Sequence, residues 1–203
     1  MARKLKKDLA TVSEPHVAIA DWTTQHYGVD TYRRDEMEAL AKAALSVPEG
    51  GAIVEIGVYG GCSSSILLQA ARGRNVRVVL CDPCMWMWND QVNDRLQATL
   101  TEFKDVQTVV AIPEYSDKLA ARLDDPIDLV HIDGDHSASM VDLDCRSWLP
   151  KLKSGGLACF HDYRSVDGHD PFPGMPDMVD THTGTWDQVW HGGQLGLAIR
   201  RKP

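Results

Sequence analysis

The sequence lacks an apolar run that could cross a membrane, since no stretch approaches the roughly 20 apolar residues of a spanning helix. It also lacks the pattern of a secretory signal, because the basic residues at positions 3–7 are not followed by an apolar segment. The cysteines are few, odd in number and placed in or beside apolar segments; they are Cys62, Cys81, Cys84, Cys145 and Cys159. Such usage favours reduced thiols. We therefore expect a cytoplasmic protein without a membrane partner.

A second C-x-x-C pair is also missing. Cys81 and Cys84 have the spacing of a redox pair or of half a zinc site, but a four-cysteine zinc site needs another such pair. Pro83 follows an acid between them, at the expected end of a strand. We therefore expect these cysteines to be small buried side chains beside a turn.

Positive charge is scarce, with 21 Lys and Arg residues against 29 Asp and Glu residues and a net charge of -8. This balance argues against a nucleic-acid backbone as the main partner. The 203 residues contain no internal repeat, and a hydrophobic content of 43% is ordinary for one domain with a substantial core. We expect a small-molecule partner, and a homo-oligomer stays open.

The most informative stretch is a predicted strand that runs into a glycine-rich turn and then a helix. Residues 52–56 are apolar and β-branched, and only Glu55 near the carboxyl end interrupts them. The turn contains three glycines that let the backbone approach a ligand closely; they are Gly57, Gly60 and Gly61. The serines at 63–65 are expected to cap the helix that follows.

A carboxylate just before this turn disfavours a pyrophosphate. It can instead accept hydrogen bonds from ribose hydroxyls, or offset an ammonium or sulfonium charge. The dinucleotide pattern G-x-G-x-x-G would need a glycine where Glu55 stands, which disfavours a nicotinamide dehydrogenase. The turn therefore predicts a nucleoside ligand with a cationic tail.

Strands and helices alternate through the rest of the chain, which predicts a parallel sheet covered on both faces. Further strands are expected at 76–80, 106–112, 127–132 and 157–160. Helices are expected at 37–45, 91–103, 116–123 and around 141–149. Prolines make residues 163–183 irregular, and residues 185–191 and 194–200 read as a hairpin joined by two glycines.

Polar residues gather at the carboxyl ends of these strands, where open parallel sheets bind ligands. They are Glu55, Asp82, Asp133, Asp135, His136, His161 and Asp162. Asp82 ends the second strand, so its carboxylate is expected to accept hydrogen bonds from both ribose hydroxyls. Aromatic residues near the tips of the second and third strands could stack on a base or pack as core.

These motifs give the chain its resemblance to a known family. The form E-x-G-x-x-x-G at 55–61 resembles the first motif of class I S-adenosylmethionine-dependent methyltransferases. The stretches D-G-D-H at 133–136, L-K-S-G-G at 152–156 and H-D at 161–162 resemble the branch of macrocin-type and cephalosporin-biosynthesis-type enzymes. The resemblance covers residues 32–165.

The resemblance implies an α/β, Rossmann-like fold with a mostly parallel seven-stranded sheet, helices on both faces and a C-terminal β-hairpin. Residues 32–203 would form one cofactor-binding domain, and residues 1–31 an N-terminal segment that could act as a lid. The expected S-adenosylmethionine contacts are Glu55, Gly57, Tyr59, Gly60, Gly61, Ser63, Asp82, Ser116 and Asp133.

The same branch commonly holds a magnesium ion between the fourth and fifth strand tips, which implies Asp133, His161 and Asp162 as ligands. A hard divalent ion prefers oxygen ligands and can lower the pKa of a bound hydroxyl. An imidazole at His161 is a softer ligand, so this residue could instead be an uncoordinated base or a hydrogen-bond donor to a ligand. The other candidate bases are His136, whose ordinary pKa suits neutral pH, and Asp135.

We therefore predict a cytoplasmic S-adenosylmethionine-dependent methyltransferase that methylates a hydroxyl of a small natural product or sugar-like acceptor, assisted by Mg²⁺. One alternative is a metal-independent methyltransferase that acts on another acceptor atom. Another is a non-catalytic cofactor-binding subunit.

Overall fold

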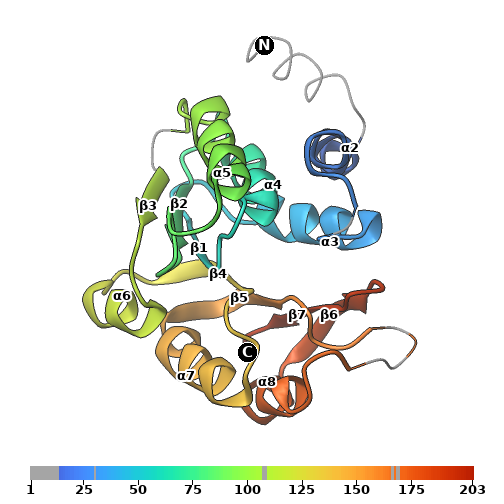
Figure 1. The fold of residues 1–203 in the computed structure, drawn as a ribbon. Helices are drawn as coiled ribbons and strands as arrows, with labels where there is room; N and C mark the ends of the chain where they lie inside the picture. Colours follow the sequence, from blue (N-terminus) through green and yellow to red (C-terminus); the bar gives the residue numbers. More distant parts are fainter. Residues whose placement is uncertain (1–13, 30, 107–108, 166, 168–169) are drawn as a thin grey trace.

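The computed structural model describes residues 14–29, 31–106, 109–165, 167 and 170–203 (Figure 1). The first 13 residues of the predicted N-terminal segment, including its basic stretch, lie outside the described residues, as do residues 107–108 of the predicted third strand. Among the described residues, no helix is long and apolar enough to span a membrane.

One seven-stranded sheet, in the order β3-β2-β1-β4-β5-β7-β6, organises the described chain. Its strands are β1 (Ala52–Ile56), β2 (Arg77–Cys81), β3 (Val109–Ile112), β4 (Ile127–Ile132), β5 (Leu152–Phe160), β6 (Asp187–Gly192) and β7 (Leu197–Arg201). The first five are parallel, while β7 runs antiparallel to both β5 and β6. The predicted fold, including its C-terminal hairpin, is confirmed.

Helices cover both faces of the sheet. They are α2 (Pro15–Tyr27), α3 (Arg34–Leu45), α4 (Cys62–Ala71), α5 (Asp90–Glu102), α6 (Ser116–Arg122), α7 (Ala138–Trp148) and α8 (Met175–Thr183), with a 3-10 turn at Leu149–Lys151. In Figure 1, α2 to α5 lie on one side of the sheet and α6 to α8 on the other. Successive residues of β1 point to opposite faces, so Ile53 joins one core cluster and Val54 the other.

The predicted serine cap of α4 is wrong. Gly61 holds the N-cap position in the left-handed region, with φ 83°, and the serines lie inside the helix. Ser64 and Ser65 use their hydroxyls on Glu55 and on the carbonyl of Cys62. The helix therefore begins from a glycine conformation rather than from a side-chain cap.

Residues 163–183 are less irregular than predicted, because they contain α8. Gly174 precedes this helix with φ 90°, and Pro176 lies in its first turn, where a missing N–H costs nothing. Met175 and Val179 are buried in the core cluster that contains Val54, on the side of the sheet covered by α6 to α8. The prolines therefore mark the start of a helix rather than its absence.

Most other boundaries differ from the prediction by one to three residues, and two further differences lie at β5 and the hairpin loop. β5 begins at Leu152, five residues before the predicted start at residue 157. The predicted glycine turn at 155–156 lies inside this strand, where its register with β4 shifts. The hairpin loop spans residues 193–196 rather than two glycines, with Gly193 and Gly196 at φ 85° and 94°. Neither difference moves the strand tips.

Candidate functional site

Unusual backbone conformations mark one edge of the sheet. Among the described residues, three that are not glycine have positive φ: Tyr59 (46°), Trp86 (71°) and Asp162 (55°). They follow the carboxyl ends of β1, β2 and β5. Such conformations cost free energy and cluster at functional sites, so this edge is the candidate site.

The glycine turn after β1 packs closely against the backbone at the tip of β4. Gly57 has φ 86°, and a Cβ there would lie 2.0 Å from the carbonyl oxygen of Asp133. Any side chain at this position would force the tips of β1 and β4 apart. Gly60 and Ser63 are buried within the turn and the helix start, whereas Tyr59 is half exposed and meets Trp88 edge-on at 5.0 Å.

Asp82 shapes this turn from the tip of β2. Its Oδ2 accepts the N–H groups of Val58 and Tyr59, both at 3.0 Å, and its Oδ1 accepts the N–H of Cys84 at 2.7 Å. The carboxylate is therefore already engaged on both oxygens by backbone. Ribose binding by Asp82 stays a prediction, and it would use the remaining acceptor capacity of these oxygens.

Glu55 is fully buried beneath the turn. Its Oε2 accepts the hydroxyl of Ser64, and its Oε1 lies 3.5 Å from Nδ1 of His131. His131, which lies inside β4, is also fully buried and contacts Tyr32 through Nε2. Glu55 thus faces a buried polar group instead of open solvent.

Four predicted site residues converge at the tips of β4 and β5. His136 Nε2 lies 3.4 Å from Asp133 Oδ1 and 3.2 Å from Asp162 Oδ2. His161 Nδ1 lies 3.4 Å and 3.3 Å from the same two oxygens. Two imidazoles therefore share two carboxylates, and we call these four residues the acid–histidine cluster.

Mutual attraction controls ionisation in the acid–histidine cluster. Burial opposes charge on His136, but the ion pairs with Asp133 and Asp162 outweigh it and raise the pKa of His136 to about 9. The same balance raises the pKa of His161 well above its ordinary value. Burial alone would raise the pKa of Asp133, yet His161 and His136 hold it far below its usual range.

Asp135 lies outside the acid–histidine cluster. It is exposed, and its Oδ1 accepts the N–H of Ser137 at 2.8 Å at the start of α7. His136 instead points into the cluster and stacks on Phe172, with ring centroids 4.3 Å apart. Of the three candidate bases named from the sequence, His136 and His161 therefore lie within the acid–histidine cluster and Asp135 does not.

Ser116, expected near the cofactor, opens α6 and donates its hydroxyl to Asp144. Both side chains are buried. Burial raises the pKa of Asp144 to about 6, a rise that Ser116 opposes and that Asp117 and Asp135 increase. This pair lies on the opposite side of the sheet tips from Glu55, and its buried carboxyl was not singled out from the sequence.

We expect Asp144→Asn to stabilise the protein at pH 7.5 by about 1–2 kcal/mol. A carboxyl whose folded pKa is raised favours folding fully below its unfolded pKa, and that contribution is lost as pH rises through about 6. Urea unfolding at pH 7.5 and pH 4 measures this. A gain of equal size at both pH values would contradict the assignment.

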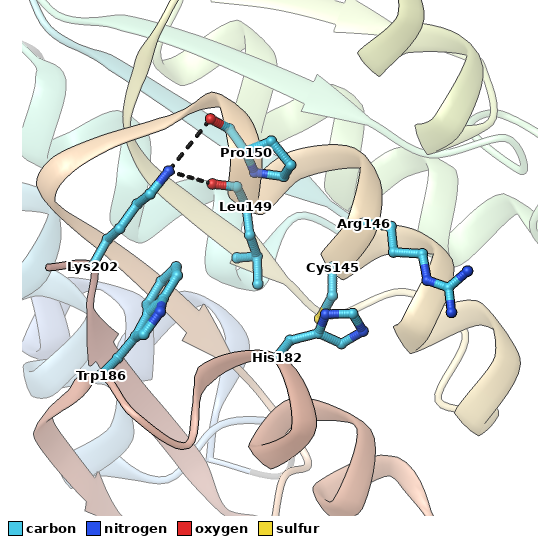
Figure 2. A pocket seen from close by; sticks show the side chains of 7 residues that line it. All are labelled: Cys145, Arg146, Leu149, Pro150, His182, Trp186 and Lys202. Atoms are coloured by element: carbon cyan, nitrogen blue, oxygen red, sulfur yellow. Dashed lines mark hydrogen bonds between the residues drawn. The ribbon is translucent and has the colours of Figure 1, made fainter.

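A separate hollow of about 380 Å³ lies between α7, α8 and the C-terminal end of β7 (Figure 2). Its cation, Lys202, donates to the carbonyls of Leu149 at 2.9 Å and Pro150 at 3.3 Å, as the dashed lines show. His182 and Arg146 both pair with Asp142. The charged side chains that line the hollow are therefore all engaged by these partners.

Comparison with known proteins gives one family and many similar folds. The family described as "Methyltransferase domain" matches residues 54–163, which run from the middle of β1 to just past β5. Among curated proteins, none matches this chain.

Solved structures share the fold at low identity. An O-methyltransferase from Bacillus cereus, in complex with SAH, is 14% identical, with all of both chains covered and a TM-score of 0.63. The O-methyltransferase TomG from Streptomyces achromogenes, in complex with SAM, is 16% identical over 96% of this chain and 92% of its own, with a TM-score of 0.62. An rRNA methylase from Streptococcus thermophilus is 14% identical over 82% of this chain and 95% of its own, with a TM-score of 0.57.

Proposed function

This chain belongs to the methyltransferase-domain family, and from that membership we propose that it transfers the methyl group of S-adenosylmethionine to a hydroxyl oxygen of a small molecule, assisted by a divalent cation. The sheet order and the C-terminal hairpin are those of the class I methyltransferase fold, and the family match supports an enzyme of this type. The observation that carries the proposal is the convergence of Asp133, Asp162 and two histidines beside the glycine turn.

The acid–histidine cluster suits a divalent cation. Among the described residues, Asp133, His136 and Asp162 each offer a ligand atom, and these atoms lie within 4.8 Å of one another. Ligand atoms around an octahedral ion with bonds of about 2.1 Å are about 3–4 Å apart. The predicted ligand His161 presents Nδ1 to the same two carboxylates, so either imidazole, or neither, would complete the set.

A bound divalent cation would supply a Lewis acid that lowers the pKa of an acceptor hydroxyl. Asp133 and Asp162 would hold it, and the backbone of the glycine turn would place the sulfonium nearby. His136 lies at the edge of the cluster, where it can take the proton from the acceptor once its carboxylate partners are neutralised. His161 is only 2% exposed, so an acceptor reaches it less readily.

The choice of a small hydroxylated acceptor over RNA rests on two observations. The net charge of -8 disfavours a phosphate backbone. The similarity to TomG and to the Bacillus cereus enzyme extends over almost the whole chain, whereas that to the rRNA methylase leaves out more of it. We therefore propose a hydroxyl of a natural product or sugar-like compound as the acceptor.

Calorimetry with S-adenosylhomocysteine and NAD tests the cofactor assignment. We expect the sulfur nucleoside to bind in the micromolar range and NAD not to bind, because Glu55 and its buried partners occupy the place of the dinucleotide glycine. Transfer of labelled methyl to a panel of catechols and sugars, with and without Mg²⁺, then tests the reaction. Binding of NAD alone would refute the proposal, and cofactor binding without transfer would favour a non-catalytic subunit.

A further inference from the structure

Tyr32 comes from the segment just before α3, yet its side chain reaches the acid–histidine cluster. It is 1% exposed. Its hydroxyl donates to Asp133 Oδ2 at 2.7 Å, and its oxygen lies 2.9 Å from His131 Nε2. A phenol has one hydrogen, so if it is donated to Asp133, His131 must provide the hydrogen of the second bond.

The ring of Tyr32 also stacks on the imidazole of His161. The two ring centroids are 3.8 Å apart, with an interplanar angle of 14°. Nδ1 of His161 faces the cluster carboxylates, and its Nε2 lies 3.6 Å from Oε2 of Glu36, on the first turn of α3. Residues 32 and 36 therefore fix the ring plane and the rotation of His161.

The contact with Tyr32 gives the two carboxylate oxygens of Asp133 different partners. Oδ2 is held by Tyr32, while Oδ1 is the atom that faces both His136 and His161. Without the phenol, the carboxylate of Asp133 could rotate, and Oδ1 would then no longer face His136 and His161. Burial and the neighbouring Asp133 raise the pKa of Tyr32 well above its ordinary value, so the phenol keeps its proton.

We propose that Tyr32 is a positioning residue of the methyltransferase site, which fixes Asp133 through its hydroxyl and His161 through its ring so that the cluster is preorganised for a divalent cation. The inference rests on the proposed function. It makes the stretch around residue 32 part of the site, and it joins Asp133 to the buried His131 through the Tyr32 hydroxyl. Groups that orient a ligand in this way commonly change metal affinity 10–100-fold when removed.

The test compares Tyr32→Phe with Tyr163→Phe. Tyr163 is 3% exposed and its hydroxyl donates to Asp180 at 2.8 Å, so it is a matched buried tyrosine that binds a carboxylate outside the cluster. Titration with Mn²⁺, followed by electron paramagnetic resonance, gives cation affinity, and calorimetry gives affinity for S-adenosylhomocysteine. We expect Tyr32→Phe to weaken Mn²⁺ binding at least tenfold, with cofactor affinity within twofold and Tyr163→Phe unchanged in both.

Equal Mn²⁺ affinity in Tyr32→Phe and the unmodified protein would overturn the inference and leave the proposed function standing. Equal weakening in both variants would also overturn it, since the effect would then be one of general packing. Failure of the unmodified protein to bind Mn²⁺ while it binds the cofactor would remove the cation from the proposed function, and the inference with it.

A second measurement does not depend on a folded variant. In the unmodified protein with labelled tyrosines, Mg²⁺ is expected to shift the ring signals of Tyr32 and to leave those of Tyr163 in place. Unshifted Tyr32 signals at saturating Mg²⁺ would overturn the inference.

Discussion

Removal of divalent cations is expected to reduce methyl transfer to an accepted hydroxylated compound by about a thousandfold, with cofactor binding almost unchanged. A thousandfold loss corresponds to about 4 kcal/mol of barrier, a reasonable share for Lewis-acid activation of a hydroxyl. Asp162→Ala should reproduce the loss, because Asp162 Oδ2 is the oxygen that faces both histidines. Initial rates after dialysis against EDTA, and after Mg²⁺ is restored, measure the effect.

Asp135→Ala is the matched control for Asp162→Ala. Both residues follow a strand tip, but Asp135 is exposed and its carboxylate accepts the N–H of Ser137, outside the cluster. We expect this variant to retain most of its activity. If Asp135→Ala were as inactive as Asp162→Ala, the proton would pass to Asp135 rather than His136. Full activity after exhaustive chelation would contradict the metal-assisted reaction itself.

The architecture was predictable because hydrophobic periodicity and glycine punctuation agree along most of the chain. Residues 52–56 and 127–132 are strands with the bounds predicted, since apolar runs between turn signals leave little choice. Helices α2 and α8 were missed for different reasons. The apolar pattern of α2 is weak, and the prolines around α8 suggested a loop although Pro176 suits a first helical turn.

The acid–histidine cluster was predictable because its members follow strand tips, which a parallel sheet brings to one edge. Tyr32 and Glu36 were not, since they precede or begin a helix and reach the cluster only through the tertiary fold. No local signal distinguishes Glu36 from other acids of α3, such as Glu38, which pairs with Arg34 at the surface. Helix-face patterning treats both as solvated charges.

Glu36→Ala is expected to destabilise the protein by about 3–5 kcal/mol, the usual scale for breaking a buried charged network. Glu36 is fully buried, and its Oε1 accepts the N–H groups of Leu195 at 3.0 Å and Gly196 at 2.9 Å in the hairpin loop. Its Oε2 accepts the N–H of Arg33 at 2.8 Å. Alanine would leave three backbone donors without an acceptor.

Thermal unfolding measures this effect against Glu38→Ala, which lies on the same helix and loses only a surface pair worth about 0.5 kcal/mol. For a chain of this size, the Glu36 variant should unfold about 10 °C lower. Glu36→Gln keeps a carbonyl oxygen for the loop and should lose less. A shift in Glu36→Ala no larger than that of Glu38→Ala would contradict the role of this carboxylate.

Gly193 provides an independent check of the same contact, because a Cβ there would lie 1.9 Å from Glu36 Oε1. Gly193→Ala should therefore destabilise the protein by the clash and by its φ of 85°. In the Glu36→Ala background the clash disappears and only the backbone strain is left. The two substitutions should then cost less together than the sum of their separate effects, and strict additivity would mean that the hairpin loop does not rest on Glu36.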